Sequence, residues 1–223
     1  MSSQIMADIG LFFEDPTTFH DPPRRYSVLY LLRRDIKTCL GINPDTGEKI
    51  AYQALLTGTM GILAGIDLLG KFLVGDDKHV GDRFRKFVDS YFAIDAPDDA
   101  ETIYQLRNAL LHSFGLYSEK KNRHGETVKV YRFTLAKVGG VLVCQVNTGY
   151  LIDILTLHNQ FEIAIESYHA DLQTCSSLQT HFAAMFSRYG HIDIGTPQHD
   201  SRGDPIATWL VQAMSEQDSV SSV

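Results

Sequence analysis

Three side chains with useful chemistry lie close together in the stretch from residue 100 to residue 117. Arg107, Asn108 and His112 supply a guanidinium, an amide and an imidazole, a set that can hold a phosphate and move protons at neutral pH. At about 100° per residue, a helix would place them opposite an apolar stripe. The members of that predicted stripe are Ile103, Leu106, Leu110, Phe114 and Tyr117. The pattern therefore predicts a helix with one chemically capable polar face.

The composition limits what that face can do. The chain has 223 residues, a 44% hydrophobic content and a formal net charge of -7, which favour one core plus a tail and disfavour a sequence-blind nucleic-acid coat. A local positive cleft for a specific nucleic acid remains compatible with that charge. Cys39, Cys144 and Cys175 are too scattered for a disulfide framework or a metal clamp, so we expect them to be reduced and largely buried. With no secretory signal pattern over 1–19, we expect a cytoplasmic protein.

The most apolar segment, 51–75, predicts a buried central helix rather than a membrane span. Asp67 and Lys71 interrupt its apolar run, which is shorter than the roughly 20 residues that a bilayer requires. Gly61 and Gly65 share one face, where they would let a second helix approach closely.

The remaining helices are predicted from apolar spacing and turn residues. A leader over 1–21 precedes a helix over 22–40, a turn over 41–49 leads into the central helix, and a short helix over 79–91 places Arg83, Arg85 and Lys86 outside. Later helices are expected over 148–172 and 176–189. The C-terminal segment, 190–223, is expected to be irregular, with a short helix near 206–214 and a frayed end.

After the motif helix, the spacing of apolar residues changes from the helical period to the alternation that is typical of strands. Residues 118–127 predict a polar loop, and alternating β-branched and polar residues on both sides of Gly139 and Gly140 predict a β-hairpin over about 128–146. The sequence shows no glycine-rich phosphate loop, nucleophile elbow or zincin pattern, so neither a metal nor a cofactor is expected.

The string Arg107-Asn108-Ala109-Leu110-Leu111-His112 resembles the signature of the HEPN superfamily, in which an arginine, usually followed by a polar residue, precedes a histidine by four to six positions. The resemblance covers roughly residues 22–172 and suggests a bacterial member. It implies an all-α fold: an HEPN-like up-and-down helical bundle over 22–189 with one inserted β-hairpin. It also implies a homodimer in which two motifs face each other across a cleft.

The resemblance further implies a metal-independent endoribonuclease, in a toxin-antitoxin or phage-defence setting, with single-stranded or loop RNA as substrate and a cognate antitoxin as a partner. His112 would move the proton of the ribose 2'-hydroxyl or of the leaving oxygen, Arg107 would hold the phosphate, and Asn108 would orient either one. The product would be a 2',3'-cyclic phosphate. Residues expected to bind the substrate are Tyr104, Tyr117, Lys120, Lys121 and Arg123.

Two alternatives use the same residues. A catalytically silent HEPN-like scaffold would bind a nucleotide, a nucleic acid or a protein partner in the polar groove. A purely structural dimer would seal Arg107 and His112 against other side chains. The lysine and arginine residues of 118–127 equally suit a mobile hydrophilic loop.

Overall fold

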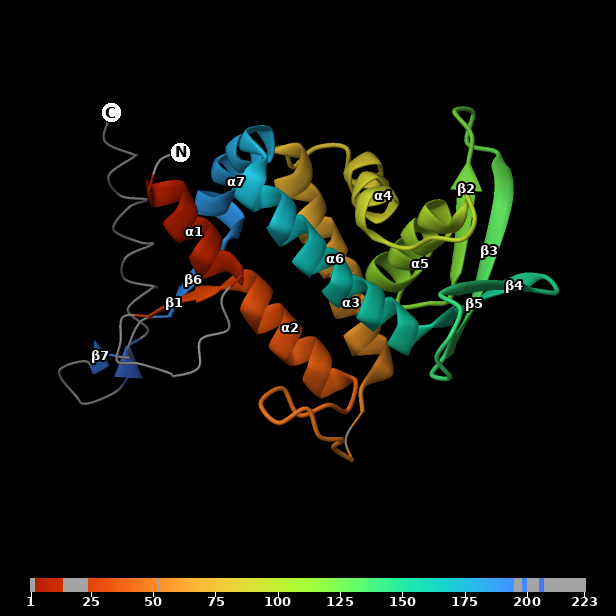
Figure 1. Ribbon diagram of the computed structural model, residues 1–223. Coiled ribbons are helices and arrows are strands. Elements are labelled where there is room, and N and C mark those ends of the chain that lie inside the picture. The colour runs from red at the N-terminus through yellow and green to blue at the C-terminus, as the bar shows by residue number, and fades with distance from the viewer. Residues whose placement is uncertain (1–2, 14–23, 52, 195–197, 200–204, 207–223) are drawn as a thin grey trace.

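The fold combines helices with a four-stranded mixed sheet (Figure 1). The computed structural model describes residues 3–13, 24–51, 53–194, 198–199 and 205–206. Its helices are α1 (Ser3–Phe13), α2 (Val28–Cys39), α3 (Leu55–Val74), α4 (Val80–Tyr91), α5 (Asp99–Ser113), α6 (Ile154–Thr174) and α7 (Ser176–Tyr189). Its strands are β1 (Arg24–Ser27), β2 (Tyr117–Lys121), β3 (Thr127–Ala136), β4 (Val143–Val146), β5 (Gly149–Asp153), β6 (His191–Ile194), β7 (Gln198–His199) and β8 (Pro205–Ile206).

Helix α3 is the centre of the helical part and contacts α2, α4, α5, α6 and α7. By length and composition it is the one helix among the described residues that could cross a bilayer, but 56% of its apolar window is buried inside the protein. The helix ends at Gly75, whose φ of 71° is a left-handed conformation that glycine adopts without strain. The expectation of a buried central helix is therefore confirmed, with its start at Leu55.

The predicted leader contains a helix that belongs to the core. Ile9 and Phe12 of α1 are fully buried, and Phe12 packs against Phe72 of α3 and Phe182 of α7, with ring centroids 4.6 and 5.5 Å apart. Residues 14–23 lie outside the described part of the chain.

The predicted all-α fold is wrong, because the second half of the chain builds a sheet with the order β2-β3-β5-β4. The predicted hairpin over 128–146 is also wrong. Its two strands, β3 and β4, do not pair with each other, because β3 lies antiparallel to β2 and parallel to β5, while β4 pairs with β5. The turns between strands that pair with each other lie at 122–126 and 147–148. The chain also reverses over 137–142, which includes Gly139 and Gly140, but there it joins two strands that β5 separates.

Two other predicted helices begin with strands. Arg24–Ser27 forms β1, paired antiparallel with β6, before α2 starts at Val28, where the Ser27 hydroxyl accepts a hydrogen bond from the Tyr30 amide. Gly149–Asp153 forms β5 before α6 starts at Ile154. Helix α7 matches its prediction, whereas the segment expected to be irregular after it contains β6, β7 and β8; residues 207–214 lie outside the described part.

Asp153 joins the sheet to α6. Its buried carboxylate accepts hydrogen bonds from the amides of Thr156 (2.8 Å), Val138 (2.7 Å) and Gly139 (2.9 Å). Burial alone would raise the pKa of Asp153, but these amide donors outweigh burial and hold the pKa below its usual value. One side chain thus caps α6 and fixes the loop between β3 and β4.

All three cysteines are free thiols. Cys39 and Cys175 are half-buried, whereas Cys144 is exposed on the edge strand β4, so the expectation of largely buried thiols is wrong for Cys144.

Candidate functional site

The motif lies on α5, as expected. Ile103, Leu106 and Leu110 are buried against the bundle, which confirms the predicted apolar stripe over the body of the helix. The stripe ends earlier than predicted, because α5 stops at Ser113. Phe114, with a φ of 49°, is 78% exposed, and Tyr117 belongs to β2 and is 47% exposed.

The three motif side chains contact one another. Arg107 Nη1 lies 2.9 Å from His112 Nε2 and donates to Asn108 Oδ1 at 3.2 Å. A guanidinium has only donors, so His112 Nε2 is the acceptor and the ring hydrogen lies on Nδ1. His112 is exposed, whereas the Arg107 side chain is only 12% exposed. The imidazole therefore lies at the surface, with its Nε2 held by the guanidinium.

Arg107 is held from behind by Asp67 of the central helix. Its Nη2 lies 3.3 Å from Asp67 Oδ2, and its buried Nε has no hydrogen-bond partner among the described residues. The other oxygen, Asp67 Oδ1, binds Arg83 of α4 through Nη2 at 2.8 Å and Nε at 3.0 Å. One carboxylate thus serves two largely buried arginines from two different helices.

Arg83 is fixed more firmly than Arg107. Its side chain is 4% exposed, and its Nη1 also donates to the carbonyl oxygens of Asp77 and Lys78 at the start of α4. The prediction that Arg83 lies outside is wrong, because its guanidinium finds these acceptors and the Asp67 carboxylate in the interior. We refer to Asp67, Arg83 and Arg107 as the charge triad.

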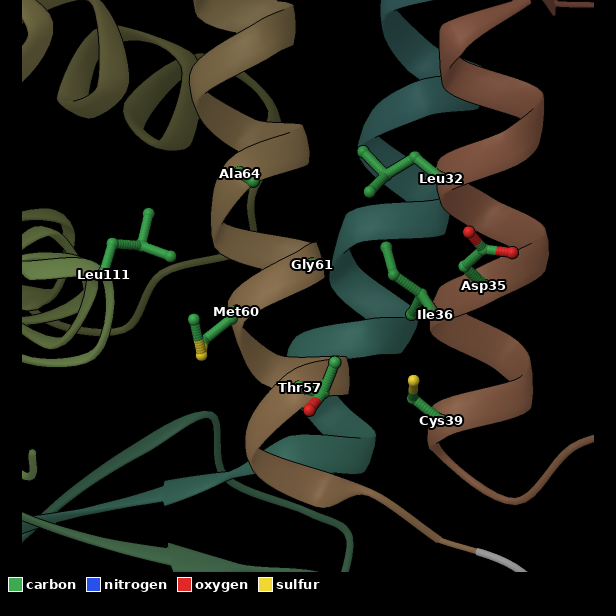
Figure 2. A pocket seen from close by; sticks show the side chains of 9 residues that line it. All are labelled: Leu32, Asp35, Ile36, Cys39, Thr57, Met60, Gly61, Ala64 and Leu111. Carbon is green, nitrogen blue, oxygen red and sulfur yellow. The ribbon is translucent and has the colours of Figure 1, made fainter. Parts of the chain in front are cut away.

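An apolar hollow of about 330 Å³ borders the motif (Figure 2). Its floor is the exposed face of α3, with Met60, Gly61 and Ala64, and α2 forms one wall with Leu32 and Ile36. The opposite wall is Leu111 of α5, the residue directly before His112.

Tyr104 lies on the exposed side of α5 but its ring is already in contact with α4. The Arg85 guanidinium lies 4.8 Å from its ring centroid, and the centroid of the Phe84 ring lies 5.6 Å away. Arg85 in turn pairs with Glu101 at 2.9 Å. Tyr104 is therefore part of an α4–α5 contact, and the structure brings it close to Arg85 instead of leaving its ring open.

Lys120 joins the same contact. It forms an ion pair with Glu101 at 3.2 Å. Burial alone would raise the pKa of Glu101, but hydrogen bonds from Gln105 and Lys120 and the charges of Lys120 and Arg85 outweigh it and lower the pKa. The cationic charge of Lys120 is thus balanced on the side of β2 that faces α5.

The other three predicted substrate-binding residues are elsewhere on the β2–β3 hairpin. Tyr117 and Lys121 belong to β2 and are exposed, and Arg123 is exposed in the turn after it. The segment expected to be a polar loop, 118–127, consists of most of β2, a tight turn and the first residue of β3. The two strands pair antiparallel, from Tyr117 opposite Arg132 to Lys121 opposite Thr127.

The sequence analysis missed Asp67 and Arg83 as members of the site. A signal for Asp67 was present, since a carboxylate inside an otherwise apolar helix requires a partner when the helix is buried. The sequence does not show which cations supply it, because they come from α4 and α5. The described residues contain no group of three or more histidine, cysteine, aspartate or glutamate side chains arranged to hold a metal ion.

Comparisons with known proteins found no family model, curated protein or solved structure that matches this chain.

Proposed function

We propose that this protein is a metal-independent endoribonuclease of the HEPN type, acting as a homodimer on single-stranded or loop RNA. The observation that carries the proposal is the 2.9 Å contact between Arg107 Nη1 and His112 Nε2, on a helix that Asp67 anchors through the same arginine. A cation and a neutral imidazole at this separation can bind a phosphodiester and remove a proton beside it.

In the proposed reaction, the scissile phosphate takes the Nη1 donor of Arg107, which releases His112 Nε2. That nitrogen accepts the proton of the ribose 2'-hydroxyl, the 2'-oxygen bonds to phosphorus, and the bond from phosphorus to the 5'-oxygen breaks. An imidazolium then returns a proton to the 5'-oxygen. The products are a 2',3'-cyclic phosphate and a 5'-hydroxyl, and the guanidinium stabilises the charge that builds on the phosphate oxygens.

The apolar hollow supports the homodimer. The small, exposed Ala64 in its floor leaves room for a bulky group, whereas Gly61 makes room for Ile36 of the same chain. The exposed Phe114 side chain directly follows the helix that provides the Leu111 wall. In this proposal a second copy covers the hollow and brings its own His112 near the first motif. An Ala64→Arg variant should then be monomeric by sedimentation and inactive, whereas an Arg188→Ala variant, which changes an exposed side chain of α7, should stay dimeric.

A cleavage assay tests the reaction. Purified protein with EDTA and mixed-sequence single-stranded RNA should release fragments with cyclic-phosphate ends, and His112→Ala or Arg107→Ala should each lower the rate about 1,000-fold or more. The matched controls are His124→Ala and Arg34→Ala, which remove an exposed imidazole and an exposed guanidinium elsewhere. Equal cleavage by the wild type and by the motif variants would identify a contaminating nuclease and overturn the proposal.

A second candidate is a catalytically silent scaffold that binds a nucleic acid or a protein partner. The observation that favours it is the charge triad, because Arg107 is 12% exposed and its charge is already opposed by Asp67. A scaffold would bind RNA or a protein without releasing cyclic-phosphate ends, and His112→Ala would leave that binding unchanged.

A further inference from the structure

The β2–β3 part of the four-stranded sheet has one face whose side chains are exposed. Its strands alternate, so Tyr131 and Phe133 of β3 point inward and are buried, whereas Val128, Val130 and Arg132 point outward and are exposed. The outward residues of β2 are Tyr117, Glu119 and Lys121. We call these six outward residues the open sheet face.

Cations on the two sides of the sheet differ in their partners. The inward Lys120 and Lys129 are paired with Glu101 at 3.2 Å and with Asp98 at 3.1 Å. For the outward Arg132 and Lys121, no carboxylate among the described residues lies within ion-pair distance. The charge of Lys121 still lowers the pKa of Glu119 on the same face, so Arg132 is the cation that most favours an anionic partner there.

Tyr117 is held beside Arg132 in an orientation that exposes its ring. The two residues are paired across β2 and β3, and the Tyr117 hydroxyl donates a hydrogen bond to Glu119 on the same face. This hydrogen bond raises the pKa of Tyr117, and together with a hydrogen bond from Thr127 it lowers the pKa of Glu119. The one carboxylate of the open sheet face is thus engaged by two hydroxyls, and the ring remains 47% exposed.

Gly149 of β5 lies against the backbone of Arg132. A Cβ at Gly149 would lie 2.8 Å from the Arg132 carbonyl oxygen, so a side chain does not fit between these strands without a shift. The arginine is therefore flanked by an aromatic ring on one side and by bare backbone on the other.

The open sheet face also lies next to the motif along the chain. Tyr117 follows His112 by five residues, and β2 is an edge strand of the sheet. Since α5 packs against the inward side of β2, an RNA strand has to pass around this edge strand to reach the open sheet face from the motif.

We propose that the open sheet face binds the single-stranded RNA that the motif cleaves, with a base stacked on Tyr117 and phosphates bound by Arg132 and Lys121. This inference rests on the proposed function for the identity of the nucleic acid. An exposed ring with flanking unpaired cations is the combination that holds single strands, because every base has a face that can stack and every linkage carries a negative charge. Arg132 is the residue that the motif resemblance does not indicate.

The binding test uses the full chain with His112→Ala, so that RNA stays intact, and a fluorescent single-stranded RNA of mixed sequence. Fluorescence anisotropy should show affinity about ten-fold weaker for Arg132→Glu and for Tyr117→Ala, while Tyr117→Phe, which keeps the ring, should bind nearly as well as the parent. The matched charge control is Arg34→Glu on α2. The slope of log Kd against log salt should also become shallower by about 0.7 for each phosphate that Arg132→Glu no longer neutralises.

Three outcomes would overturn the inference. Equal affinity for Arg132→Glu and Arg34→Glu would show that only net charge matters. Full competition by an abasic strand of the same length would show that no base stacks on Tyr117. An absence of RNA binding, together with self-association that Val130→Glu abolishes, would show that the face is covered by a second copy of the chain.

The binding test of the open sheet face and the cleavage test of the motif can fail independently of each other. If the wild type does not cleave RNA but Arg132→Glu still weakens binding, the open sheet face binds RNA and the nuclease proposal is wrong. If the wild type cleaves and the variants bind equally well, the nuclease proposal stands and the face has another use.

Discussion

Two places in this protein join an arginine, a carboxylate and a histidine, and they differ in what the histidine can reach. At the motif, Asp67 holds Arg107, and Arg107 contacts an exposed His112. Between α2 and α6, Glu162 binds Arg33 through Nη2 at 2.6 Å and Nε at 3.1 Å, and His158 Nε2 lies 3.8 Å from the same carboxylate.

The histidine of the second place offers no accessible nitrogen at Nε2, which is buried without a hydrogen-bond partner among the described residues. Its side chain is 14% exposed. Residue type therefore does not distinguish a packing contact from a candidate catalytic group. The exposure of the imidazole distinguishes the two places, and four predictions follow for the residues around them.

The largest effect is expected for Asp67→Asn. The substitution keeps the shape of the side chain but leaves Arg83 and Arg107 without an opposing charge in a largely buried site, and it should lower the free energy of unfolding by about 3 kcal/mol. It should also lower cleavage, because Arg107 loses its anchor. Urea unfolding and the cleavage assay measure the two effects. The control is Asp82→Asn, which changes an exposed partner of Arg85. Its free energy of unfolding should change by less than about 0.5 kcal/mol. Similar losses in both variants would contradict the role of the charge triad.

A smaller effect is expected for Glu162→Gln, which weakens the charge-assisted bonds to Arg33. We expect a loss of about 1–2 kcal/mol in the free energy of unfolding, with no change in the cleavage rate of the folded protein. Loss of stability without loss of activity would sharpen the comparison with Asp67. A cleavage rate that falls as far as in Asp67→Asn would erase the distinction between the two places.

The third prediction concerns the end of the motif helix and is a gain in stability instead of a loss. Phe114 adopts a left-handed conformation with a φ of 49°, so Phe114→Gly should raise the free energy of unfolding by up to about 1 kcal/mol. If Phe114 helps to fill the apolar hollow of a second copy, the same change should weaken the dimer in sedimentation experiments. Unchanged dimerisation would remove Phe114 from the proposed interface.

The smallest effect is expected from the titration of His158. Burial lowers the pKa of His158 below its usual 6.5, against the opposing charge of Glu162, and the charges of Lys37 and Arg33 lower it further. Since the unfolded chain takes up the proton at a higher pH than the folded chain, this histidine should reduce stability as the pH falls below about 6.5 and should have no effect above it.

Urea midpoints at pH 8 and pH 5.5 measure that effect. The drop between the two values should be smaller in His158→Gln, which does not titrate, than in the wild type. Equal drops would show that other groups cause the loss of stability at low pH and that burial of His158 does not contribute to it.

The helical part was largely predictable from the sequence. Apolar spacing and breaking residues located α3, α4, α5 and α7 to within a few residues, because the signals that define such helices are local. The helix predicted over 22–40 began too early, since the strand character of Arg24–Ser27 depends on its pairing with β6 far along the chain.

The sheet was only half predictable. Alternating residues indicated the strands β3 and β4, but they do not say which strand pairs with which, and Gly139 and Gly140 suggested a turn between partners that are separated by β5. The candidate site was likewise predictable only in its local part. The order Arg107, Asn108 and His112 is local and was found, whereas the contact of Asp67 with Arg83 and Arg107 joins three helices and could not be found from spacing.

The carboxylate of Asp153 has a mechanical consequence. Because it accepts hydrogen bonds from the first turn of α6 and from the loop at Val138 and Gly139 at the same time, separation of β5 from β3 would pull the start of the longest helix among the described residues away from that loop and leave the two loop amides without their acceptor. Strands β4 and β5 and the start of α6 should therefore open as a single cooperative unit, with amide protons on all three reporting one common free energy of opening in hydrogen exchange.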